Sequence, residues 1–307
     1  MLNTSDDIYT DITDSSFLYD CDDEATDYLQ TSKYITTSDL SSFFNFGIVD
    51  NVNIMHINCR SLKKNFDSVI NLLHPLNNNI TAIAFTETWL TPETETLYAL
   101  PGYNFVCRSR IDKIGGGVGI YINSDFSYKY RTDLSIFNDN IESLFLEVVQ
   151  ARSKFLIGCI YRPPGTDIST FINLLVPILE TINSKRRPLL TLLTGDFNID
   201  LIKSSNHSPS EDFLNILKSF SFLPTITSPT RITLTSATLI DNIFINDFSH
   251  KFSSTAIYSD ISDHLPIAIN MNMKKDTIRP KSEYTKRIYS PEIIKKFKRC
   301  VEFCLLG

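Results

Sequence analysis

The amino-acid sequence predicts an α/β fold of four layers, in which two packed mixed β-sheets are flanked by helices. Three observations support this prediction. The ordered part opens with a strand, a helix and a second strand, an alternation typical of layered α/β proteins. About ten short apolar segments follow the spacing of strands, many of them in hairpin-like pairs, and three or four segments have helical periodicity. This set of elements fits two sheets packed face to face with the helices outside.

The strands are predicted from short apolar runs and from alternation of apolar and polar residues. They are expected at 52–58, 80–90, 103–110, 117–123, 142–149, 155–164, 188–196, 240–246, 254–259 and 265–272. The helices are expected at 66–76, 168–182, 211–220 and 290–306. The glycine run 115–117 leads into a strand and not into a helix, which predicts a hairpin turn in place of a phosphate-binding loop.

Charge divides the chain into three parts. The net charge is −6, yet residues 1–50 carry 11 acidic residues against one lysine, and we expect this segment to be mostly disordered. Residues 274–307 carry ten basic residues against four acidic ones and read as a basic linker with the start of a helix. A single folded domain is expected between them, at 51–273. Because the acidic excess is confined to one tail, it does not argue against a nucleic-acid partner for the domain.

The sequence predicts an intracellular protein without a membrane partner. It contains no apolar run of 18 residues and its N-terminus lacks the features of a secretory signal. Its six cysteines form no C-x-x-C pair, and Cys59, Cys107 and Cys159 lie in or beside apolar strands. We interpret them as reduced core thiols.

Several predicted strands end in polar residues. The clearest case is 188-PLLTLLTGDFNID-200, in which an apolar run is followed by Asp196 and Asn198. Strand 52–58 ends in Asn58, and strand 80–90 carries Glu87 within T-E-T-W. Ligand sites of layered α/β folds gather at strand ends, so these groups are expected to converge.

The residue types at these ends suit hydrolysis of a phosphate ester. Mg²⁺ prefers oxygen ligands and takes one or two carboxylates, a role for which Glu87 is available. Asp196 is suited to align the attacking water, and His264 to neutralise developing charge if Asp241 or Asp263 fixes its tautomer. Each motif taken alone is weak, because a Gly-Asp-Phe-Asn turn or a Ser-Asp-His cap is also common without any catalytic role.

Taken in order, the motifs resemble the endonuclease/exonuclease/phosphatase superfamily. The motifs are N-C-R-S-L (58–62), T-E-T-W (86–89), Y-R-P-P (161–164), G-D-F-N (195–198), I-D-N-I (240–243) and S-D-H (262–264). N-C-R-S-L, Y-R-P-P and G-G-G-V-G-I-Y-I are similar to the apurinic-type endonuclease domain of non-LTR (LINE-type) retrotransposon proteins. The resemblance covers about 52–272 and implies the four-layer fold of that superfamily.

The resemblance also implies residue roles. For the metal site, Mg²⁺ with Mn²⁺ as a substitute, it implies Glu87, Asn58 and Asp263. For catalysis it implies Asp196, His264, Asp241, Tyr161 and Asn198, with Asn198 and Tyr161 also contacting the scissile phosphate. Arg108, Arg110 and Arg162 are expected by position to contact the DNA backbone, the alternative being ordinary surface charge.

The favoured function is a Mg²⁺-dependent DNA endonuclease that nicks one strand and leaves a 3′-hydroxyl to prime reverse transcription. Two alternatives remain open, a phosphatase or phospholipase of the same superfamily and an inactive remnant that acts as a binding module. No reverse-transcriptase signature follows the domain, so we expect a truncated element protein whose connector helix begins near Ser290. Element RNA would be a partner only through regions missing from this chain, and nuclear entry is expected from the family's role.

Overall fold

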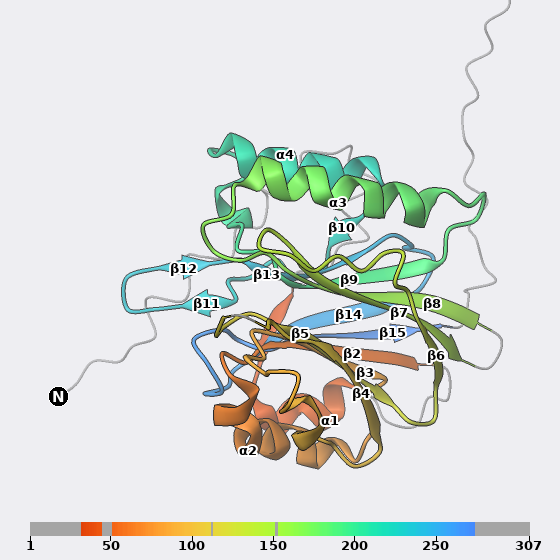
Figure 1. Cartoon of the computed structure of the whole chain (residues 1–307), viewed down its shortest axis with the longest axis vertical. Helices are drawn as coiled ribbons and strands as arrows, with labels where there is room; N and C mark the ends of the chain where they lie inside the picture. Colours follow the sequence, from red (N-terminus) through yellow and green to blue (C-terminus); the bar gives the residue numbers. More distant parts are fainter. Residues whose placement is uncertain (1–31, 45–50, 112, 151–152, 274–307) are drawn as a thin grey trace, which may run out of the picture. The chain divides into compact units, whose positions relative to one another are not determined.

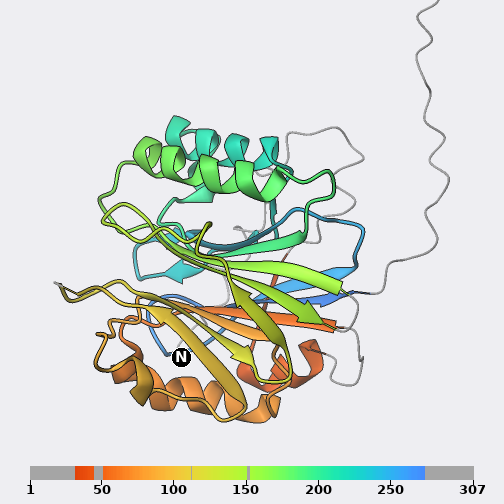
Figure 2. The ribbon, with the colours of Figure 1, turned by 45° about the vertical axis from the view of Figure 1, so that its right-hand side comes forward.

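Two β-sheets packed face to face form the centre of the computed structural model, which describes residues 32–44, 51–111, 113–150 and 153–273. One sheet has seven strands in the order β1-β14-β15-β2-β3-β5-β4, and the other has six in the order β10-β13-β9-β8-β7-β6. Helices α1 and α2 cover the outer face of the seven-stranded sheet, and α3 and α4 cover the outer face of the six-stranded sheet (Figures 1 and 2). The predicted four-layer α/β architecture is therefore confirmed.

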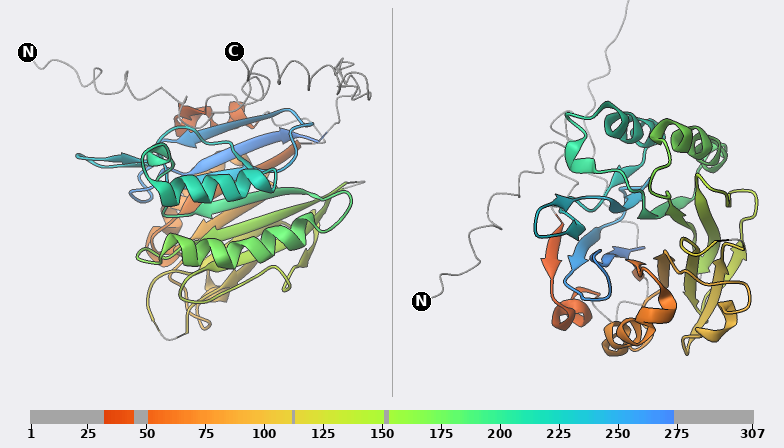
Figure 3. Two further views of the ribbon diagram at one scale, coloured as in Figure 1. Left: turned by 90° about the horizontal axis from the view of Figure 1, so that it is seen from above. Right: turned by 60° about the vertical axis from the view of Figure 1, so that its left-hand side comes forward.

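The bounds of the elements follow the predicted periodicity closely. The strands are β1 (Lys33–Ile35), β2 (Asn51–Asn58), β3 (Ala82–Thr86), β4 (Tyr103–Arg108), β5 (Val118–Asn123), β6 (Ser127–Tyr130), β7 (Glu142–Gln150), β8 (Ser153–Tyr161), β9 (Leu190–Asp196), β10 (Leu223–Pro224), β11 (Arg231–Ile232), β12 (Ala237–Thr238), β13 (Asp241–Ile245), β14 (Phe252–Ile257) and β15 (Ile267–Asn272). The α-helices are α1 (Leu40–Phe43), α2 (Leu62–Leu73), α3 (Ile168–Asn183) and α4 (Ser208–Ser219). Strands β4 and β5 pair as the expected hairpin, and β11 and β12 form a separate hairpin that protrudes beyond both sheets (Figures 1 and 3).

The alternation of side chains along β2 shows how the fold places polar groups between the sheets. Val52 and Ile54 belong to the larger core, whereas Met55 and Ile57 belong to the smaller core beside α2. Because successive side chains of a strand point to opposite faces, Asn58 continues the row of Val52 and Ile54. The row that faces the other sheet therefore ends in a buried amide.

Part of the segment 1–50, which is expected to be mostly disordered, lies within the described part of the chain. Within it, residues 32–44 are ordered, with β1 paired in parallel to β14 and α1 packed beside the seven-stranded sheet. Leu40 and Phe44 are fully buried there, and the backbone amide of Ser32 donates to Thr227. The polar composition of the segment gave no indication that Leu40 and Phe44 are buried. Residues 1–31 and the predicted linker and helix within 274–307 lie outside the described residues.

Strand β3 is shorter than predicted, because it ends at Thr86 and not at Leu90. Glu87 and Trp89 take left-handed backbone conformations, with φ of 55° and 53°, which a continuing strand does not allow. None of the helices in the described part of the chain has the length and hydrophobicity needed to cross a membrane.

Candidate active site

Five strands deliver polar side chains to one place between the sheets. Strands β2 and β3 run parallel and end at Asn58 and Thr86, and β8 and β9 run parallel and end at Tyr161 and Asp196. Strand β13 runs antiparallel to β9, so that Asp241 at its start is the register partner of Asp196. The predicted convergence of strand ends is thus what the topology produces.

Asn58 links the two carboxylates nearest the centre of the site. Its Nδ2 donates to Oδ2 of Asp196 at 2.8 Å and to Oε1 of Glu87 at 3.0 Å. The other oxygen of Glu87 accepts from Nε1 of Trp89 at 3.2 Å. One ligand atom each from Glu87, Asp196 and His264 lies within 4.8 Å of the others. The two carboxylates of this group fit a divalent cation with a preference for oxygen ligands.

Asp196 is completely buried and held by three donors. Oδ1 accepts from the backbone amide of Asn198 at 2.9 Å, and Oδ2 accepts from the side chains of Asn58 and Asn198 at 2.8 and 3.2 Å. Burial and the neighbouring charge of Asp241 raise the pKa of the Asp196 carboxyl to about 8, while His264 opposes this shift. A raised pKa makes the carboxylate a stronger proton acceptor, which suits a general base.

His264 is paired with Asp241 on the opposite side of the site. Nδ1 of the imidazole lies 2.9 Å from Oδ2 of Asp241, which also accepts from the hydroxyl of Thr230 at 2.8 Å. Burial opposes the charged ring, but the Asp241 carboxylate outweighs it and raises the pKa of His264 to about 9. The ring is cationic at neutral pH and its Nε2 remains for an anionic ligand.

A second buried histidine, His56, lies beside this pair and is neutral. Its Nε2 lies 3.1 Å from the Thr86 hydroxyl, and desolvation lowers its pKa to about 4 in spite of the nearby Asp241 carboxylate. Only His264 therefore offers positive charge from an imidazole among the described residues of the site. His56 is a fully buried polar residue of the core.

The loops after β3 and β9 carry backbone strain that fixes the site residues. Glu87 and Asn198 both have positive φ, 55° and 48°, a conformation that costs free energy in residues other than glycine. Gly195 comes so close to the preceding strand that a Cβ there would lie 1.7 Å from the carbonyl oxygen of Ile160. This is the physical reason for glycine in the Gly-Asp-Phe-Asn turn.

Tyr161 reaches the site from β8, where its register partners are Asp196 and Glu142. The side chain is almost fully buried, and burial together with the Glu87 and Asp196 carboxylates raises the pKa of its hydroxyl. The hydroxyl therefore stays protonated and can donate a hydrogen bond. The structure brings Tyr161, Asn58, Glu87, Asp196, Asn198, Asp241 and His264 together.

Asp263 departs from its expected place in the metal site. Its carboxylate accepts hydrogen bonds from Nη1 of Arg60 at 2.8 Å and from Nε of Arg231 at 2.9 Å, and Nη2 of Arg231 forms an ion-pair contact with it at 2.8 Å. It is not a member of the group formed by Glu87, Asp196 and His264. Two guanidinium groups occupy the oxygens that a cation would need.

Arg162 is buried, where the sequence placed it at the surface. Its Nε donates to the carbonyl of Phe197 at 2.8 Å, its Nη2 to that of Asn198 at 2.6 Å, and its Nη1 to that of Thr166. Asn198 returns a bond to the carbonyl of Arg162 at 2.8 Å. Arg162 therefore holds the Asp196–Asn198 turn in place, and its donors are not available to DNA.

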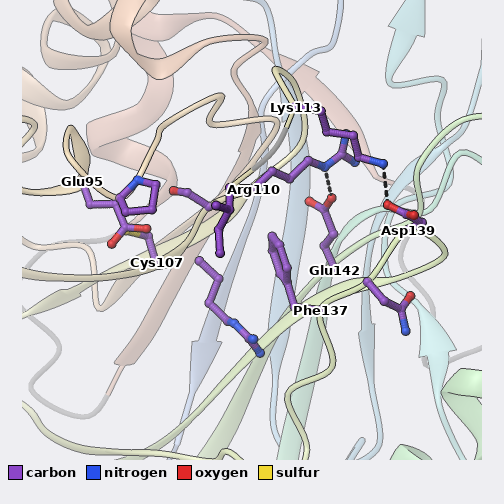
Figure 4. Close-up of a pocket in the computed structure, with 12 residues that line it drawn as sticks. Glu95, Cys107, Arg110, Lys113, Phe137, Asp139 and Glu142 are labelled. Atoms are coloured by element: carbon purple, nitrogen blue, oxygen red, sulfur yellow. Dashed lines mark hydrogen bonds and ion pairs between the residues drawn. The ribbon is translucent and has the colours of Figure 1, made fainter.

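Arg108 lines a cavity of about 700 Å³, and its guanidinium carbon lies 5.0 Å from the ring centre of Phe137. The cavity also contains ion pairs between Arg110 and Glu142 and between Lys113 and Asp139, drawn as dashed lines in Figure 4. The residues that line this cavity do not include Glu87, Asp196 or His264. The chemistry is therefore assigned to the strand ends, and the expected backbone contact of Arg108 stays a prediction.

Four residues of the site were missed by the sequence analysis. Thr230 bonds to Asp241, Trp89 bonds to Glu87, and Arg60 binds Asp263. The hydroxyl of Ser262 donates to the carbonyl of Asn58 at 2.6 Å and accepts from the amide of His264. Trp89, Arg60 and Ser262 stand within or next to the quoted motifs, whereas no local pattern distinguished Thr230.

Comparisons with solved structures agree with this fold. Solved structures with the same fold include the endonuclease domain of TRAS1, a telomere-specific non-LTR retrotransposon, with 12% identity, a TM-score of 0.57 and coverage of 73% of this chain and 100% of that one. The AP endonuclease LMAP from Leishmania major has 12% identity and a TM-score of 0.59, with coverage of 89% and 100%. The 3′ phosphatase NExo from Neisseria has 14% identity and a TM-score of 0.53, with coverage of 71% and 98%.

No curated protein matches the sequence. A family model does match, over residues 55–264, which is more than half of the chain and contains every residue of the site described above. The chain therefore belongs to the endonuclease/exonuclease/phosphatase family.

Proposed function

We propose that this chain is a Mg²⁺-dependent DNA endonuclease of a non-LTR retrotransposon, which nicks one strand and leaves a 3′-hydroxyl. The observation that carries the proposal is the proximity of two carboxylates and a charged imidazole. Asn58 joins the carboxylates of Glu87 and Asp196, and the Asp241-bound imidazolium of His264 lies within 4.8 Å of both. A phosphodiester between them would meet a base and a cationic donor at once.

A divalent cation would be held by Glu87 and Asp196 and would neutralise charge on the phosphate oxygens. Mn²⁺ is expected to replace Mg²⁺ there. Nδ2 of Asn58 donates to both carboxylates and so holds them together. For Asn58 to bind the cation through Oδ1, its side-chain amide would have to rotate.

The residues of the chain account for the hydrolytic step. Asp196, positioned by Asn198, accepts a proton from water as the water oxygen bonds to phosphorus. The imidazolium of His264 stabilises the charge that develops on the nonbridging oxygens. The bond from phosphorus to the 3′ oxygen breaks, Tyr161 donates a hydrogen bond to that oxygen, and a proton taken up there gives the 3′-hydroxyl.

DNA is the proposed substrate because the motifs N-C-R-S-L and Y-R-P-P resemble those of retrotransposon endonucleases. The fold shared with the TRAS1 domain and with LMAP is compatible with that choice. A phosphatase would need the same catalytic groups, so the substrate has to be decided by assay.

The test is conversion of supercoiled plasmid to open circle by the full chain with Mg²⁺. We compare wild type with Asp196→Asn, His264→Gln and the control Asp247→Asn, which alters an aspartate paired instead with His250. Nicking that only the first two substitutions abolish supports the proposal. A folded wild type that releases phosphate from a phosphomonoester but leaves the plasmid intact would overturn it, as would one that binds DNA without cutting.

A further inference from the structure

Asp263 lies between two arginines that come from different parts of the chain. Arg60 follows β2, and Arg231 begins β11. Their guanidinium groups donate two hydrogen bonds, of 2.8 and 2.9 Å, to the single carboxylate, and Nη2 of Arg231 forms a further ion-pair contact with it at 2.8 Å. We call these residues the Arg60–Asp263–Arg231 cluster. It joins the edge of the catalytic centre to the base of the protruding hairpin.

The cluster lies next to the proposed catalytic groups. Asp263 directly precedes His264, and Arg231 forms an isolated β-bridge with His264. Arg60 stands two residues after Asn58, whose amide links Glu87 and Asp196. The hydrogen bond from Asp263 raises the pKa of Arg60, and the Glu87 carboxylate adds to this, so the guanidinium is within electrostatic reach of the site.

The positive charge of the two arginines exceeds the negative charge of the Asp263 carboxylate. One aspartate between two arginines leaves a net charge of about +1, and an exposed ion pair contributes at most about 1 kcal/mol to stability. The side chains of Arg60 and Arg231 are 46% and 40% exposed. Within the described part of the chain, Nε and Nη2 of Arg60 and Nη1 of Arg231 have no hydrogen-bond partner.

We propose that Arg60 and Arg231 bind a phosphodiester of the DNA backbone adjacent to the reacting one, and that Asp263 positions their guanidinium groups. The proposal rests on the proposed function for its ligand. Guanidinium groups present several N–H donors in a plane and suit the paired oxygens of a phosphate. Asp263 holds the two guanidinium groups in position before DNA binds, which reduces the conformational entropy lost on binding.

The first experiment measures the salt dependence of DNA affinity, with nicking prevented by EDTA. The variant is Arg60→Gln with Arg231→Gln. The control is Arg186→Gln with Arg187→Gln, which removes two exposed charges from the loop before β9, at the opposite end of that strand from Asp196. Loss of one phosphate contact lowers the slope of log affinity against log salt by about 0.9. We expect that change in the Arg60/Arg231 variant and no change in the control.

The second experiment asks whether Asp263 holds the cation. Trp89 is the single tryptophan of the chain, and its indole donates to Glu87, so its fluorescence reports cation binding at that carboxylate. We expect Asp263→Asn to bind Mn²⁺ as tightly as wild type. A loss of tenfold or more, the size expected for a residue of the metal site, would overturn the positioning role.

The two proposals fail separately. If wild type nicks DNA but the Arg60/Arg231 variant keeps the full salt slope, the phosphate site is wrong and the nuclease stands. If wild type does not nick, yet the variant loses about 0.9 from the slope, the phosphate site stands and the nuclease is wrong.

Discussion

Asp196 and Asp241 are directly opposite each other on the antiparallel strands β9 and β13, yet their carboxyl pKa values shift in opposite directions. Both are buried. For Asp241, the penalty of burial is outweighed by His264, so its pKa is lowered, whereas burial and the Asp241 charge raise that of Asp196. The two carboxylates therefore suit different tasks, that of Asp241 as the counter-ion of an imidazolium and that of Asp196 as a proton acceptor.

Replacing Asp241 removes the source of the His264 charge. We expect Asp241→Asn to lower the pKa of His264 from about 9 towards its ordinary value of 6.5, because burial is then opposed only by the charges of Asp196 and Asp263. Nicking at pH 7.5 should fall by about 10² to 10³, as for loss of one charge-stabilising donor. NMR titration of the imidazole measures the pKa. Asp247→Asn, which faces His250, should leave the His264 titration in place, and an unchanged pKa in Asp241→Asn would contradict the assignment.

The same pair makes stability depend on pH. The folded pKa of His264, about 9, lies above its unfolded value near 6.5, so its contribution is complete below pH 6.5 and is lost as pH rises through 9. Without added cation, we expect wild type to lose roughly 3 kcal/mol relative to His264→Asn between pH 6 and pH 10. Urea unfolding in EDTA measures this difference. Equal pH dependence in both proteins would show that Asp241 does not stabilise the imidazolium.

Much of the fold was accessible from the sequence, because apolar periodicity is local. The strand before Asp196, the hairpin at the glycine run and the helix 168–182 were each visible in a short window. Strand β1 was not, because three residues in a polar segment gain their order from pairing with β14, more than 200 residues away. Short strands β10 to β12 likewise depend on partners and not on their own pattern.

The same distinction between local and distant information applies to the site. Types and order of the residues indicated Glu87, Asp196 and His264, which the structure brings within reach of one another. The hydrogen-bond partners of the site residues could not be predicted from residue type and order. Asp263 and Arg162 both differ from expectation because their hydrogen bonds join segments far apart in the chain or involve backbone carbonyls, which carry no sequence signal.

Gly195 should tolerate no side chain. In Gly195→Ala the Cβ would meet the Ile160 carbonyl at 1.7 Å, in backbone that cannot yield without separating β8 from β9. We expect a loss of about 3 kcal/mol or more, with loss of nicking in any protein that folds. Gly165→Ala is the control, because its φ of 85° is also strained for alanine but nothing lies within 4 Å of the added carbon. Its loss should be about 1 kcal/mol, and thermal unfolding compares the two.

Arg162 should act through the Asp196–Asn198 turn and not through DNA. Lysine keeps the charge of arginine but cannot bond the carbonyls of Phe197, Asn198 and Thr166 together, so Arg162→Lys and Arg162→Gln should be similarly impaired. We expect each to lose about 2 to 4 kcal/mol of stability, since buried carbonyls lose their donors, and to lower kcat while leaving the salt slope of DNA affinity unchanged. A phosphate contact would give the opposite pattern, with Arg162→Lys near wild type and Arg162→Gln reduced in slope. Unfolding, nicking kinetics and salt titration of the two variants therefore separate a residue that positions the turn from one that touches the substrate.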